Sequence, residues 1–292
     1  MTGNNTSSTN STAPIGIFDS GVGGLSVWRE IRRQLPDEAT VYFADQAHVP
    51  YGPRGREEIL HFSEAITRQL LSAGCKAIVV ACNTASAAAL KQLRESFPDK
   101  IIIGMEPAVK PAAASTRTGV IGIMATAATF QGRLFLATAG RHARECQLIN
   151  QVCHGLAEHI ETGHLDGPEI EAMLSSFVAP MLQANADTIV LACTHYPFIL
   201  PTLRQLVGND INVINPAPAI ARHLGHSLRE AQLLRTTVDR PSSRPSRHRL
   251  FTSTDSQRFT EIAARLIEET EVEIGSLPWL ENGRLAAFPS HN

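Results

Sequence analysis

The chain has 292 residues, a formal net charge of −2, 43% hydrophobic residues and 18% charged residues. This length and composition predict a globular protein of two ordinary domains. The near-neutral charge gives no electrostatic reason to expect a nucleic-acid partner or an anionic membrane surface. No apolar run approaches the roughly 20 residues that span a bilayer, so no membrane-spanning helix is predicted.

The first half of the chain alternates strand and helix patterns after an uncharged, polar start. Residues 1–13 have neither the charge nor the apolar run of a secretory signal, so we expect a disordered tail there. Strands are predicted at 15–19, 40–44, 77–81 and 101–103, and helices at about 24–35, 56–73 and 84–97. The stretch at 45–55, with two prolines and two glycines, predicts a loop.

The same rhythm restarts at Val120. Strands are predicted at 120–123, 147–150, 188–192 and 249–252, and helices from about 129 and at 155–161, 167–184 and 257–268. Residues 236–247, rich in Pro, Ser and Arg, predict a linker, and residues 271–292 predict a C-terminal tail. The alternation favours an α/β fold in which parallel sheets are flanked by helices.

Two segments of the chain are nearly the same. Residues 78–84 read IVVACNT and residues 189–195 read IVLACTH, which places Cys82 and Cys193 111 residues apart. Ile15-Gly16-Ile17 likewise returns 106 residues later. The offsets predict two pseudo-symmetric α/β domains, one made of 14–106 and 218–270 and the other of 107–217. Open α/β sheets bind ligands at their strand ends, so both thiols are expected in an active site between the domains.

The cysteines favour a reducing, cytoplasmic setting. The chain has five of them, an odd number, with no C-x-x-C pair, so neither a disulfide framework nor a structural zinc site is indicated. After Cys82, Asn83 and Thr84 are good helix caps, and the helix dipole there should lower the pKa of the thiol and attract a carboxylate. Cys193 has a similar setting, followed by Thr194 and His195. A pair of inert, buried cysteines is the alternative.

Two further polar clusters invite functional readings that the spacing does not support. The turn Asp19-Ser20-Gly21-Val22-Gly23-Gly24 differs from G-x-G-x-x-G and lacks the lysine of a P-loop, so a nucleotide site is disfavoured. Asp19 is instead expected to accept a proton or hold an ammonium group. The HGLAEHIETGH stretch at 154–164 matches neither zinc-protease motif, and a solvated helix face is favoured over a metal site.

Together these segments resemble the glutamate racemases of the aspartate/glutamate racemase superfamily. The resemblance runs from about residue 15 to 268 and is carried by FDSGVGGLSV at 18–27, YFAD at 42–45, PYG at 50–52, ACNTAS at 81–86, GMEPAVKPA at 104–112, ACTHYP at 192–197 and FTSTD at 251–255. The combination of ACNTAS with ACTHYP is a specific signal for these enzymes.

The resemblance implies an isomerase that interconverts L- and D-glutamate without cofactor or metal, and so serves peptidoglycan synthesis, cell wall biogenesis and cell shape. Cys82 would act on D-glutamate and Cys193 on L-glutamate, with Asp19 assisting the first and His195 the second. Glu161 would support the histidine. The residues implied to hold glutamate are Asp19, Ser20, Tyr51, Gly52, Asn83, Thr84, Thr194 and His195.

Other functions stay open at this point. A racemase or isomerase of the same superfamily could act on aspartate or another acid, and a non-catalytic ligand-binding protein would carry inert thiols. The expected partner is the small-molecule substrate, with no nucleic acid and no membrane, and a homodimer is left open.

Overall fold

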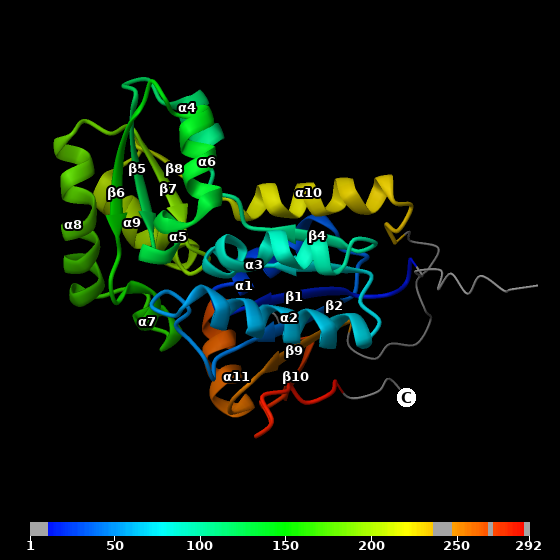
Figure 1. Cartoon of the computed structure of the whole chain (residues 1–292). Coiled ribbons are helices and arrows are strands. Elements are labelled where there is room, and N and C mark those ends of the chain that lie inside the picture. Colours follow the sequence, from blue (N-terminus) through cyan, green and yellow to red (C-terminus); the bar gives the residue numbers. More distant parts are fainter. Residues whose placement is uncertain (1–10, 236–246, 268–270, 289–292) are drawn as a thin grey trace, which may run out of the picture.

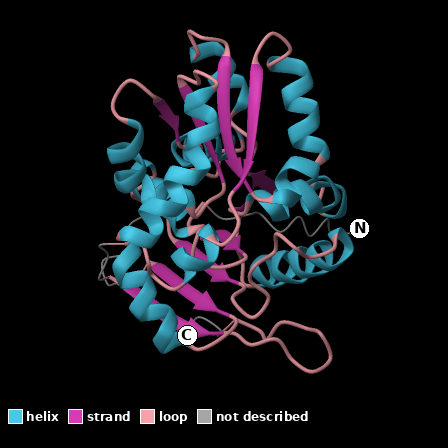
Figure 2. Ribbon diagram, turned by 90° about the vertical axis from the view of Figure 1, so that its left-hand side faces the viewer, coloured by secondary structure: helices cyan, strands magenta, loops and turns pink. Residues whose placement is uncertain are grey.

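The computed structural model describes residues 11–235, 247–267 and 271–288. Within these ranges the chain forms two parallel β-sheets flanked by helices, which confirms the predicted α/β class (Figure 1). Figure 2 shows the strands of one sheet above those of the other, with helices on either side. The expected N-terminal tail and the expected linker at 236–247 lie almost wholly outside the described residues.

The larger sheet has six strands in the order β10-β9-β2-β1-β3-β4, all parallel. Its strands are β1 (Ile15–Asp19), β2 (Thr40–Ala44), β3 (Ala77–Val80), β4 (Ile101–Gly104), β9 (His248–Thr252) and β10 (Val272–Ser276). The central strands read as unbroken apolar runs because both faces of the sheet are covered.

The smaller sheet has four parallel strands in the order β6-β5-β7-β8. They are β5 (Val120–Ala125), β6 (Gln147–Val152), β7 (Thr188–Ala192) and β8 (Asn212–Ile214). This order repeats the arrangement β2-β1-β3-β4 of the larger sheet. The repeat of motifs in the sequence is therefore a repeat of topology, and the predicted pseudo-symmetry of the two halves is confirmed.

Alternating side chains of the larger sheet face two different layers of helices. Ile17 and Val79 pack toward α1 (Leu25–Gln34), α10 (Ala217–Glu230) and α11 (Ser256–Leu266). Phe18 and Val80 point the other way, toward α2 (Arg56–Ser72) and α3 (Asn83–Ser96). This period of two follows from the strand geometry, and it leaves the carboxyl ends of β1 and β3 free for polar residues.

Helices cover the smaller sheet in the same way. They are α4 (Val109–Ser115), α5 (Ala127–Gln131), α6 (Arg133–His142), α7 (Leu156–Glu161), α8 (Pro168–Gln183) and α9 (Leu200–Val207), with the short 3-10 helix η1 (Tyr196–Ile199). One hydrophobic cluster runs without a break from the α1 side of the larger sheet to the α8 side of the smaller one. The two halves are thus joined by core packing beside the strand ends.

The C-terminal part of the chain differs from its prediction. Residues 271–292 were expected to be a tail, yet β10 pairs in parallel with β9 and extends the larger sheet. Its alternation was too short and too weak to indicate a strand from the sequence. The helix α10 was not predicted, although its apolar residues follow the helical period; it packs on α1 after the last strand of the smaller sheet. The exact domain boundaries stay a prediction.

Candidate active site

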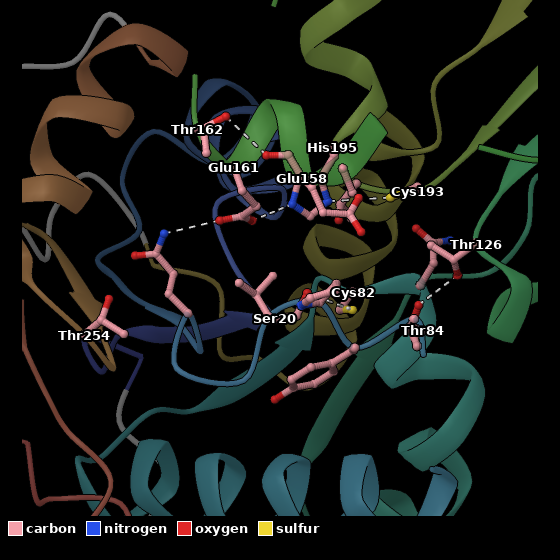
Figure 3. Close-up of a pocket in the computed structure, with 18 of the residues that line it drawn as sticks. Ser20, Cys82, Thr84, Thr126, Glu158, Glu161, Thr162, Cys193, His195 and Thr254 are labelled. Carbon is pink, nitrogen blue, oxygen red and sulfur yellow. Dashed lines mark hydrogen bonds and ion pairs between the residues drawn. The ribbon is translucent and has the colours of Figure 1, made fainter. Parts of the chain in front are cut away.

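The strand order places the polar turns of both halves at equivalent sites. In each sheet the chain leaves the central strand and its cysteine-bearing neighbour in different directions, which opens a crevice at their carboxyl ends. Asp19 is the last residue of β1 and Cys82 follows β3, while Thr126 and Cys193 follow β5 and β7. Residues of all four turns meet at one cavity of about 490 Å³ (Figure 3).

Most of the predicted site residues line this cavity. They are Ser20, Tyr51, Gly52, Cys82, Asn83, Thr84, Glu161, Cys193, Thr194 and His195. Asp19 does not line the cavity: its side chain is fully buried and contacts the lining residues Ser20 and Thr194. The sequence argument thus gathered residues that lie far apart in the chain around a single space.

Cys82 is the N-cap of α3 and a buried thiol. Its sulfur accepts a hydrogen bond from the backbone N–H of Ala85 (3.4 Å) and donates to Ser20 Oγ (3.8 Å). Burial, and next the charge of Asp19, raise the pKa of Cys82 well above its ordinary value, although the Ala85 bond opposes them. The expectation that the helix terminus lowers this pKa is therefore wrong, because desolvation and a like charge outweigh one N–H group.

Asp19 closes β1 with an unusually well-bonded carboxylate. Its Oδ1 accepts the backbone N–H of Ser20 at 2.7 Å, and Oδ2 accepts the N–H of Gly24 and the hydroxyl of Thr194 at 3.2 Å. Burial raises the pKa of Asp19 above its ordinary value, and the nearby His195 works in the opposite direction. The bond to Thr194 ties the turn after β1 to the turn that follows Cys193.

Cys193 begins a second series of contacts, which leads through His195 to Glu161. Its sulfur lies 3.6 Å from His195 Nδ1, and His195 Nε2 lies 2.6 Å from Glu161 Oε1 (Figure 3). Burial alone would lower the pKa of His195, but the bonds with Cys193 and Glu161 raise it well above the ordinary value. A protonated imidazole donates from both nitrogens, so it can hold a negative charge on Cys193.

Two glycines explain the loop that resembled a nucleotide-binding turn. A Cβ atom on Gly21 would collide with the Glu161 carboxylate, and one on Gly23 would collide with the ring of His195. Between them, the backbone N–H of Val22 donates to Glu161 Oε1 at 2.7 Å. The glycines therefore allow the loop after β1 to touch and orient the Glu161–His195 pair.

Other groups in the cavity can bind a polar ligand. The amide of Asn83 is 5% exposed and its nitrogen and oxygen have no hydrogen-bond partner within the described part of the chain. Buried polar groups without partners are costly, so this amide is ready to bind a ligand. Across the cavity, Thr84 Oγ1 lies 3.1 Å from Thr126 Oγ1, which joins the start of α3 to the start of α5.

The histidine-rich stretch at 154–164 lies partly at the surface and partly in the candidate site. Among the described residues, no group of three or more His, Cys, Asp or Glu side chains is arranged to hold a metal ion. His159 lies 3.5 Å from Glu169 at the surface, as the solvated-face interpretation expects. Glu161, two residues further along, is only 9% exposed and faces the cavity instead.

Sequence reasoning missed about half of the lining. The additional residues are Gln46, Val49, Pro50, Thr126, Ala157, Glu158, Thr162, Thr254, Asp255 and Arg258. Gln46 donates to Glu161 Oε2 at 3.2 Å and accepts from Thr252, so it connects the pair to β9. The FTSTD motif next to Arg258 was the one available signal that this distant segment reaches the site.

The chain is similar to known proteins over most of its length. The family profile described as Asp/Glu/Hydantoin racemase matches residues 15–224. The chain belongs to this racemase family. It is 46% identical over 278 residues to the glutamate racemase of Stutzerimonas stutzeri, covering 95% of this chain and 98% of that one. It is 46% identical over 256 residues to that of Roseiflexus sp., covering 88% and 93%.

Solved structures of the family share the fold. A glutamate racemase from Bacillus anthracis superposes with a TM-score of 0.82 at 31% identity, covering 92% of this chain and 98% of that one. The Escherichia coli glutamate racemase, solved with L-glutamate and the activator UDP-MurNAc-ala, gives a TM-score of 0.76 at 31% identity, covering 91% and 98%. The two-sheet arrangement is therefore the fold of this racemase family.

Proposed function

We propose that the protein is a glutamate racemase that interconverts the two enantiomers with two thiols and no cofactor. The observation that carries the proposal is the position of Cys82 and Cys193, which follow topologically equivalent strands and line one cavity. Each has its own acidic or basic neighbour, Asp19 beside one and His195 beside the other. One group on each side is what removal and return of a proton on opposite faces require.

The charges in the site favour a defined starting state. Burial and the neighbouring carboxylate keep Cys82 as a neutral thiol, which can donate a proton. The imidazolium of His195 faces Cys193 and can donate a hydrogen bond to its sulfur, which suits Cys193 to the role of proton acceptor. In the proposed reaction Cys193 removes the α-proton of L-glutamate and Cys82 protonates the resulting carbanion from the other face. After this step Cys193 is the thiol and Cys82 the thiolate, which is the arrangement that the reverse reaction of D-glutamate needs.

The carbanion is the costly species on this path. An amino-acid α-proton is less acidic than a thiol by about ten pK units or more, which at about 1.36 kcal/mol per unit is roughly 14 kcal/mol. Hydrogen-bond donors fixed in a buried site lower such a barrier, because they need no reorganisation when charge develops. Asn83 and Thr84 supply donors at the cavity wall, at the start of α3.

The remaining lining residues fit glutamate as the substrate. Of the described residues that line the cavity, Arg258 is the one Lys or Arg, and it has no ion pair or hydrogen bond to the rest of the described chain. It lies at the exposed side of the cavity, where it can attract the γ-carboxylate. The product D-glutamate would serve peptidoglycan synthesis.

The setting we propose is the cytoplasm. All five cysteines are free thiols, which fits a reducing compartment. The described residues contain no helix long and apolar enough to cross a bilayer.

The proposal is tested by incubating purified protein with L-glutamate and measuring D-glutamate by chiral chromatography. Activity should survive dialysis against a chelator and against hydroxylamine, which remove metal ions and pyridoxal groups. Loss of activity after either treatment would contradict the cofactor-free mechanism. Racemisation of aspartate at a higher kcat/KM than glutamate would contradict the proposed substrate.

A further inference from the structure

The segment after β10 folds back onto the larger sheet. We call residues 277–288 the C-terminal clamp. Leu277 and Leu285 are each only 3% exposed, and Trp279 pairs with Leu285 in an antiparallel bridge. Gln69 of α2 donates to the carbonyl of Leu285 at 3.2 Å. In Figure 1 this segment, red, lies beside β10 at the edge of the sheet.

The clamp reaches a buried carboxylate in the loop that follows β2. The indole Nε1 of Trp279 donates to Asp45 Oδ1 at 2.7 Å. Asp45 is fully buried, and its Oδ2 accepts the hydroxyl of Tyr51 at 2.7 Å and lies 2.9 Å from His48 Nδ1. A buried carboxylate needs such donors, because each one it lacks leaves charge unpaired away from water.

Aromatic rings pack around the hydrogen bond between Trp279 and Asp45. The His48 ring stacks on Phe62 with centroids 3.8 Å apart, and Trp279 meets both rings edge-on at 5.0 and 5.4 Å. Phe62 belongs to α2, so the clamp, the loop and a helix meet in one cluster. Such rings have few rotatable bonds, and together they fix the direction of the indole N–H.

The loop held in this way is part of the substrate cavity, whereas the clamp is not. Gln46, Val49, Pro50, Tyr51 and Gly52 line the cavity, and no residue of 277–288 does. We infer that Trp279 is a positioning residue, which acts through Asp45 to hold residues 46–52 in the conformation that binds substrate. The kinetic part of this inference rests on the proposed function, and its structural part does not.

Trp279→Phe tests the hydrogen bond while it keeps an aromatic ring. The loop lines the cavity but carries neither thiol, so its loosening should weaken binding of the substrate and of the transition state equally. We expect KM for glutamate to rise about ten-fold, the effect of one hydrogen bond to a charged group, with kcat changed less than about two-fold. Leu280→Ala is the matched control, since this clamp side chain is 48% exposed and should leave KM unchanged.

Coupling to Tyr51 distinguishes a route through Asp45 from a general loss of stability. Tyr51→Phe removes a second donor to the same carboxylate, the hydroxyl that bonds Asp45 Oδ2. If both donors act by fixing Asp45, the double variant should raise KM by less than the product of the two single effects. Independent, multiplicative effects would contradict the shared carboxylate.

Amide hydrogen exchange of the substrate-free protein tests the structural part of the inference and needs no assay of activity. In Trp279→Phe the amides of residues 46–52 should exchange faster than in the wild type, while those of β5 and β7 stay unchanged. Unchanged exchange in 46–52 would overturn the inference, and so would faster exchange throughout the protein. If wild-type protein racemises no glutamate but the loop still loosens, the proposed function fails and the clamp stands.

Discussion

His195 keeps its proton because two neighbours outweigh its burial. The hydrogen bonds with Cys193 and Glu161 raise its pKa, whereas desolvation alone would lower it. Glu161→Gln removes the charge of one of these neighbours, so the pKa of His195 should fall. In the proposed mechanism the imidazolium of His195 supports Cys193 as the base. Activity is therefore lost as the pH rises through the pKa of His195. The alkaline limb of the kcat/KM profile should therefore move to lower pH.

The control for this profile is Glu171→Gln, a carboxylate exposed on α8 away from the cavity. Its pH profile should match that of the wild type. An alkaline limb in Glu161→Gln that stays in place, or moves to higher pH, would show that Glu161 does not act on His195.

Racemisation should require both Cys82 and Cys193. A serine hydroxyl is scarcely ionised near neutral pH, and one positioned acid–base group contributes typically about 10²–10⁴-fold. Cys82→Ser and Cys193→Ser should each lose at least this much in kcat/KM. Enantiomers have equal free energies, so the loss must be equal for L- and D-glutamate. Exchange of the α-proton on the side of the remaining cysteine can survive.

Cys146→Ser is the matched thiol control, because Cys146 is a free, half-buried cysteine outside the cavity. It should racemise like the wild type. A wild-type rate of racemisation in either Cys82→Ser or Cys193→Ser would contradict the two-thiol mechanism.

Gly23 shows how a residue without a side chain positions a catalytic one. A methyl group there would meet the His195 ring, so Gly23→Ala should displace the ring and cost about 1–3 kcal/mol of unfolding free energy. Misplacing a reacting group by about 1 Å can cost on the order of 10²-fold, and kcat should fall accordingly. Gly140→Ala in α6, where the added atom meets nothing within 4 Å, should keep kcat and raise the unfolding free energy by about 0.5–1 kcal/mol, as alanine does within a helix. A wild-type kcat in Gly23→Ala would contradict the close approach.

The helix α11 carries charge to the site from outside the matched family region. Arg258→Gln should lower kcat/KM several-fold at low ionic strength, and the difference should shrink as salt screens the charge. The matched control is Arg265→Gln, the same change on an exposed part of the same helix outside the cavity. Steady-state kinetics from low to high salt make the comparison. Equal salt dependence in both variants would remove Arg258 from substrate capture.

Elements with strong periodicity were predictable from the sequence, and weakly patterned ones were not. The strands at 15–19, 40–44 and 188–192 were predicted with the bounds that the structure has. The helix α10 is an exception, because its apolar residues Ile220, Leu224 and Leu228 follow the helical period and were overlooked. The three-residue strand β8 is too short to show a period. The strand β10 is half-exposed at a sheet edge, so its sequence lacks the run of apolar residues that marks a buried strand.

At the scale of the whole molecule, the repeat of motifs predicted the repeat of sheet order and one shared site. It could not predict the charge states inside that site, since the pKa of Cys82 depends on burial and on Asp19, which only tertiary packing brings together. Nor could it indicate that the last segment of the chain returns to the loop after β2, because a single hydrogen bond from Trp279 leaves no periodic pattern.

The central claim is that two thiols act on opposite faces of one carbon. It is tested most directly by following L-glutamate in D2O with wild-type protein, using proton NMR and mass analysis of the separated enantiomers at early times. The account predicts that the D-glutamate formed carries deuterium at the α-carbon while the remaining L-glutamate keeps its proton, because the base that removes the proton is not the acid that returns one. Deuterium entering L-glutamate as fast as D-glutamate forms, or no D-glutamate at all, would contradict it.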